Sequence, residues 1–117
     1  MATTATRKQV VTYTGDVTAT ETLSAAINTA SPAQIQILNL LLGANTITPP
    51  TGGVTIVAVT IRPPAGNTAL ITLKGVTGDT GVPLHKTDPT CLALDTTLTT
   101  FVLTAASAVT GLRLDWN

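Results

Sequence analysis

The sequence predicts an all-β protein, a jelly-roll-like antiparallel β-sandwich of about eight strands with an N-terminal arm. Threonine, a β-branched residue that suits a pleated strand, supplies 26 of the 117 residues. Short apolar segments recur about every 8–12 residues between turns rich in proline and glycine, which is the spacing of sandwiches and small barrels. No stretch of more than about ten residues has the 3.6-residue period of a helix.

The length is that of a single domain, which divides into an arm over residues 1–9 and one sandwich domain over residues 10–117. The arm is made of small and polar residues and buries too little apolar surface to become ordered by itself. We therefore expect it to lie against the domain or a neighbouring molecule. Arg7 and Lys8 are its candidate interaction residues for an acidic partner, and a solvated tail is the alternative.

The first strands are expected at Val10–Tyr13 and at residues 17–23, joined by a turn at Gly15-Asp16. Threonine alternates with apolar residues in the second of these segments, although Glu21 interrupts its apolar face. Residues 23–28 are compatible with one helical turn that ends at Ser31-Pro32.

The middle of the chain has segments in which apolar residues occupy both odd and even positions. Residues 34–37 alternate glutamine with isoleucine, but Leu38, Leu40 and Leu42 continue on the opposite parity, so we expect a bulge or a change of partner near Ile37–Leu38. A short strand at 46–48 is stopped by two prolines. Residues 54–61 are apolar on both parities, as in a strand covered on both faces.

The rest of the chain predicts four further segments with alternating apolar residues. These are centred on Ala69, Ile71 and Leu73, on Leu92 and Leu94, on Phe101 and Leu103, and on Leu112, Leu114 and Trp116. The glycine-rich segment 75–81 lacks the Lys-Ser/Thr ending of a phosphate-binding loop, so we interpret it as a turn that needs positive φ.

Composition excludes several classes of protein. The formal net charge is zero and no basic run occurs, so nucleic acid is not an expected partner. The single Cys91 excludes an intrachain disulfide and a cysteine-based zinc site, and we expect it to be a small buried hydrophobe. Neither an apolar run of about 18 residues nor a secretory signal is present, so no membrane contact is expected.

The candidate chemical groups do not combine into a site, and we expect no catalytic residues, no cofactor and no metal. His85 is the only histidine, and none of the three serines lies in a G-x-S-x-G context, so the protein is not expected to be an enzyme. We expect His85 to be a loop residue hydrogen-bonded to backbone. Asp79, Asp88 and Asp95 lie close together in the chain but lack the spacing of a calcium loop. Trp116 is expected in the core, and a sugar-stacking platform is the alternative.

The surface chemistry favours assembly. Monomeric proteins commonly protect their edge strands with lysine or inward-pointing charges, and this chain has only three lysines. A threonine-rich surface with few charges is therefore better suited to a homo-oligomer than to a monomer.

The segment 73–81, followed by Pro83-Leu84-His85 and Asp88-Pro89-Thr90, resembles part of the small structural proteins of tailed bacteriophages. The likeness extends over about residues 54–117, with a looser match at 42–47. It implies a virion protein that is made in the host cytoplasm and acts through its surface and strand edges. The favoured role is a capsid decoration (cement) protein, most naturally a trimer, that binds the major capsid protein or other virion proteins on the outside of the shell.

Two alternatives remain open. A neck or tail component would need the same kind of neutral β-domain. A glycan- or receptor-binding β-sandwich is also possible, although such sites commonly use two or more exposed aromatic rings and this chain has three aromatics in all.

Overall fold

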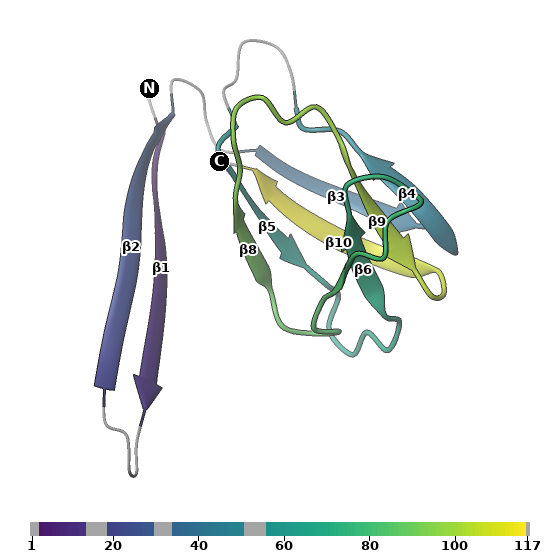
Figure 1. Ribbon diagram of the computed structural model, residues 1–117, viewed down its shortest axis with the longest axis horizontal. Helices are drawn as coiled ribbons and strands as arrows, with labels where there is room; N and C mark the ends of the chain where they lie inside the picture. The colour runs from purple at the N-terminus through teal and green to yellow at the C-terminus, as the bar shows by residue number, and fades with distance from the viewer. Residues whose placement is uncertain (1–2, 14–18, 30–33, 51–55, 117) are drawn as a thin grey trace.

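The computed structural model describes residues 3–13, 19–29, 34–50 and 56–116, and in these ranges the protein contains strands and no helix (Figure 1). Among these residues there is therefore no helix that could span a membrane. The all-β prediction is confirmed. The strands are β1 (Thr3–Tyr13), β2 (Ala19–Thr29), β3 (Gln34–Leu40), β4 (Gly43–Ile47), β5 (Ala58–Arg62), β6 (Ile71–Lys74), β7 (Val82–Pro83), β8 (Thr90–Ala93), β9 (Phe101–Ala105) and β10 (Val109–Trp116).

The first two strands form an antiparallel hairpin that pairs with neither sheet of the sandwich. Thr3 pairs with Thr29 at one end and Tyr13 with Ala19 at the other. β1 includes most of the segment assigned to the arm. Residues 23–28, which the sequence left compatible with one helical turn, instead continue β2, and each pairs across to β1, which satisfies the backbone without a helix.

The other eight strands form two four-stranded antiparallel sheets in the orders β3-β10-β5-β8 and β4-β9-β6-β7. Successive strands change sheet at every connection except β6 to β7, so nearly all the pairings join segments that are distant in sequence. Eight strands that alternate in this order between two sheets form a jelly roll, as predicted. Figure 1 shows the two sheets as the layers of the sandwich, with the hairpin beside them.

The core lies between the two sheets and is built mainly from β5, β9 and β10. In β10, Leu112, Leu114 and Trp116 are fully buried while Arg113 is exposed, as the alternation predicted. The ring of Trp116 is tilted by 50° to that of Phe101 at a centroid distance of 6.1 Å, a common geometry for packed aromatic rings. The expected core position of Trp116 is confirmed, and its burial leaves no ring face for a sugar.

The strand β10 contains a bulge opposite β3. Leu40 pairs with Val109 and Leu38 with Leu112, so two residues of β10 lie opposite Asn39 alone. One of them, Gly111, has a φ of 83°, which side chains disfavour, and its amide donates to Oδ1 of Asn39 at 3.0 Å. The irregularity expected near Ile37–Leu38 therefore lies in the partner strand instead.

Candidate functional site

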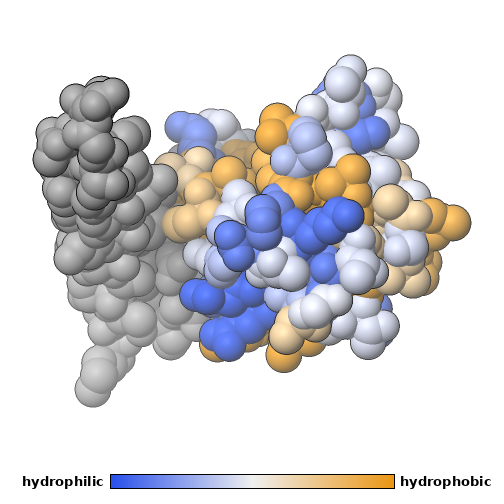
Figure 2. Space-filling model, turned by 90° about the horizontal axis from the view of Figure 1, so that it is seen from below, coloured by the Kyte–Doolittle hydropathy of each residue, from blue (hydrophilic) through white to orange (hydrophobic). Residues whose placement is uncertain are grey.

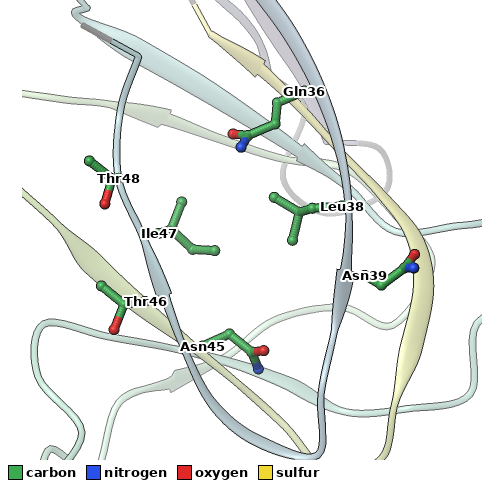
Figure 3. Close-up of a pocket in the computed structure, with 7 residues that line it drawn as sticks. All are labelled: Gln36, Leu38, Asn39, Asn45, Thr46, Ile47 and Thr48. Carbon is green, nitrogen blue, oxygen red and sulfur yellow. The ribbon is translucent and has the colours of Figure 1, made fainter.

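The side of the sandwich formed by β3 and β4 is open. Each is the terminal strand of its sheet, and a pocket of about 390 Å³ lies between them. Figure 3 shows Leu38 and Ile47 pointing toward one another across this pocket from the two strands. The pocket is lined by Gln36, Leu38, Asn39, Asn45, Thr46, Ile47 and Thr48.

The amide groups around the pocket already have partners within the protein. The side-chain nitrogen of Asn45 donates to the carbonyl oxygens of Leu41, Gly43 and Leu103, and its oxygen accepts from the amide of Leu41 at 2.9 Å. Asn45 therefore holds the β3–β4 turn against β9. The oxygen of Gln36 accepts from the indole nitrogen of Trp116 at 3.2 Å. These bonds give the amides a structural role at the rim of the pocket.

The outer face of β3 is apolar and exposed. Residues 34, 36, 38 and 40 lie on the side of the core, and Leu40 is completely buried there. Ile35 and Ile37 consequently lie on the outer side, where they are 61% and 68% exposed. The bulge or change of partner expected within this segment is wrong: a single parity runs through β3, with the leucines on the side of the core and the isoleucines on the outer side.

Two more large apolar residues are exposed at the end of this strand. Leu41 and Leu42, in the turn between β3 and β4, are 72% and 73% exposed. Figure 2, a view of one face, shows apolar surface in several places between polar residues. We use the name open edge for β3 together with its outer residues Ile35 and Ile37.

A charged group borders the open edge on the same outer face. In the neighbouring strand β10, Arg113 pairs with Ile37 and Asp115 with Ile35. The carboxylate of Asp115 accepts from Nε of Arg62 and from Nε of Arg113, each at 2.6 Å. Partial burial opposes ionisation of Asp115, but the hydrogen bonds and charges of Arg113 and Arg62 outweigh it and lower its pKa.

A second pocket, of about 610 Å³, lies at the opposite side of the sandwich, near β7 and β8. Its lining is largely apolar, and the one carboxylate that the described residues contribute to it, that of Asp79, is already used locally. This carboxylate accepts from the amides of Gly75 and Val76 and closes the glycine-rich segment as a turn, as expected. Gly81 adopts a φ of 77° there, and a Cβ atom at this position would lie 2.6 Å from the carbonyl oxygen of Leu73.

The residues that the sequence singled out for chemistry lie apart from one another. Nδ1 of His85 accepts from the backbone amides of Thr87 and Asp88, so its expected role as a loop residue is confirmed. Asp95 accepts from the amide and hydroxyl of Thr97 in a separate turn, and these bonds lower its pKa. No group of three or more metal-ligating side chains occurs among the described residues.

Cys91 is exposed, which contradicts the expectation that it is buried. It pairs with Thr60 of β5, and this pairing places it on the outer side of the sheet, away from the core. The apolar residue that β8 contributes on the inner side is its neighbour Leu92.

Arg7 and Lys8, the predicted interaction residues, lie in the hairpin. Arg7 pairs with Ala25 and Lys8 with Ser24. Their side chains are outside the described part of the structure, which therefore describes no contact for them. The sequence missed the open edge, although the uncharged run from Gln34 to Leu40 was a signal for it.

Comparisons with known proteins identify no relative: no family model, no curated protein and no solved structure matches this chain.

Proposed function

We propose that this protein is a non-enzymatic structural protein of a bacteriophage virion, a decoration protein that binds the outside of the capsid and stabilises the shell. The observation that carries the proposal is the hairpin β1–β2, which shares no strand pairing with the sandwich. The jelly-roll fold agrees with it, since capsid proteins commonly use this fold. The sequence resemblance to small phage structural proteins supplies the choice of a virion.

The hairpin has the properties of a contact element. Each of its strands has 11 residues, which corresponds to a length of about 37 Å. A two-stranded hairpin is only marginally stable alone, because neither edge is paired and little apolar surface is buried. A ribbon of this length is stabilised by binding a larger surface, such as the major capsid protein. Arg7 and Lys8 lie near its middle, at the positions proposed to contact that surface.

The number of copies in purified particles tests the proposal. Quantitative mass spectrometry against the major shell protein would give a ratio close to that protein's own abundance if this chain covers the capsid lattice. A small multiple of the copy number of the portal or tail rings would instead identify the alternative, a neck or tail component. Absence from the particles would refute a structural role in the virion.

Charge reversal tests the part played by the hairpin. Lys8→Glu is expected to weaken binding of the added protein to undecorated particles, measured by co-sedimentation, because it places a negative charge at the proposed contact. Lys86→Glu is the matched control, since it makes the same change in an exposed loop of the sandwich. Equal binding by both variants would exclude Lys8 from the contact.

Binding of a glycan or receptor is the second candidate, favoured by the pocket between β3 and β4. Its volume is within the range of about 300–1,000 Å³ that small-ligand sites have, and lectin domains also use jelly rolls. The internal hydrogen bonds of Asn45 and Gln36 weigh against it, as does the burial of Trp116. Specific binding on a glycan array that Asn39→Ala or Thr48→Ala abolishes would make it the leading function.

A further inference from the structure

The strand β3 is an unprotected sheet edge. It pairs with β10 on one side only, and no strand of the described residues pairs with its other side. With seven residues it is longer than the other terminal strands of the sandwich, β8, β4 and β7, which have four, five and two. It contains no charged residue and no proline, the devices that usually prevent a sheet edge from pairing with another chain.

Neither face of the sheet is fully covered by other residues at this edge. On the outer face Ile35 and Ile37 are mostly exposed. On the inner face the pocket between β3 and β4 occupies the position beside the half-buried Leu38. One further strand added to the sheet at β3 would cover the isoleucines with its outer residues and would extend its inner residues toward the pocket.

The sequence of β3 is complementary to itself in the antiparallel direction. If a two-fold axis passes at Gln36, then Ile35 of each copy lies opposite Ile37 of the other and Gln36 lies opposite Gln36. All four isoleucines then form cross-strand pairs on one face, the arrangement that stabilises antiparallel pairs. The oxygen of Gln36 is already bonded to Trp116, but its amide nitrogen remains able to donate to the facing glutamine. An axis at Ile37 would instead place Ile35 opposite Asn39.

The rows of the sheet give this contact an apolar centre and a charged rim. Ile37 is followed across the sheet by Arg113 and then Arg62, and Ile35 by Asp115. The ion pairs of Asp115 with Arg62 and Arg113 in each copy would therefore border the four isoleucines without being buried among them. Interfaces between proteins are commonly arranged in this way, because charged groups lose little hydration at the rim.

We propose that β3 is a self-association site, through which two copies of this chain join their four-stranded sheets by antiparallel β3–β3 pairing about a two-fold axis at Gln36. With the axis at Gln36, residues 34–38 of each copy pair within β3, a length of about 17 Å, so the contact buries roughly a few hundred Å² per copy. This is less than the roughly 1,000 Å² of total area expected of a stable interface, so the dimer is weak and reversible. The pairing gives an even number of subunits, in place of the trimer expected from the resemblance.

Sedimentation velocity of the full-length protein from about 10 µM to about 1 mM tests the association. The unchanged protein is expected to shift from monomer toward dimer over this range. Ile37→Lys should weaken the association at least about tenfold, because it places an ammonium group in the apolar centre. Val76→Lys is the matched control, since Val76 is 63% exposed in a loop and should leave the association unchanged. A protein that stays monomeric, or equal association of the two variants, would overturn the proposal.

Disulfide trapping tests the register and the identity of the occupant. In a Cys91→Ser background, which removes the exposed native thiol, Ile35→Cys and Ile37→Cys proteins are mixed and oxidised. The mixed 35–37 disulfide should predominate, because cross-strand neighbours have Cβ atoms close enough for the bond. Predominance of the 37–37 disulfide would refute this register. A dimer that forms no disulfide between β3 strands would show another occupant of the edge, such as the hairpin, and would refute self-pairing. These outcomes are independent of whether the chain is found in virions.

Discussion

Truncating Leu114 to alanine should destabilise the sandwich strongly. Leu114 is fully buried in β10, between its cross-strand neighbours Gln36 in β3 and Ile61 in β5. The change removes three carbon atoms, which at about 0.8 kcal/mol each corresponds to about 2.4 kcal/mol of lost burial. Strands on both sides limit how far the site can collapse, so a cavity term adds to this value. We expect the free energy of unfolding to fall by about 3–4 kcal/mol, within the range of about 2–5 kcal/mol typical of such changes.

Urea denaturation followed by the fluorescence of Trp116 measures this loss, because Trp116 is the only tryptophan and is buried in the same strand. The control is Leu42→Ala, which makes the same chemical change at a residue that is 73% exposed, and its effect should be within about 0.5 kcal/mol. In a domain of this size the loss in Leu114→Ala corresponds to a fall in Tm of roughly 10–30 °C. A loss below about 0.5 kcal/mol, or one equal to that of the control, would refute the assignment of the inner face of β10.

Three other properties can be measured on the same protein. Asn45→Ala should lower the free energy of unfolding by about 1–3 kcal/mol, because it removes the amide that joins the β3–β4 turn to β9. Urea denaturation measures this loss, and an unchanged midpoint would contradict the role of Asn45. The lowered pKa of Asp115 means that its ion pairs with Arg62 and Arg113 stabilise the fold above its ordinary value of 3.8 and lose this effect as the pH falls through the lowered pKa. Asp115→Asn should therefore be less stable than the unchanged protein near neutral pH and should lose less stability on acidification, and parallel pH profiles of the urea midpoint would refute this. Cys91 should react with a thiol reagent in the native protein at a rate close to that in urea, whereas strong protection would show that it is buried.

The sequence predicted the strands of the sandwich well where one parity was clearly polar. Leu112, Leu114 and Trp116 alternate with charged residues in β10, so only one face could be buried. The prediction failed in β3, where both parities carry large apolar residues and periodicity alone cannot choose between them. It also failed at Cys91. Neighbouring residues of a strand point to opposite faces, so only one of Cys91 and Leu92 can face the core, and the pairing of β8 with β5 determines that it is Leu92.

The candidate site was predictable only in part. A charge-poor edge was expected from the shortage of lysine, but the strand that forms this edge could not be identified. That identity depends on the order β3-β10-β5-β8, which joins Gln34–Leu40 to a strand more than 60 residues later in the chain. The hydrogen bond from Trp116 to Gln36 depends on this pairing of β3 with β10, and the one from Asn45 to Leu103 depends on the long-range pairing of β4 with β9 in the other sheet.

The sequence by itself determined that this chain forms short strands joined by proline and glycine turns, because alternation and turn chemistry act over neighbouring residues. Only the tertiary structure decided which face is buried in strands with apolar residues on both parities, which strands end the sheets, and that Ile35 and Ile37 remain exposed beside an unpaired edge. The physical reason is that the space between two sheets is limited. Strands far apart in the sequence fill it together, and an apolar residue that finds no room there lies on the surface.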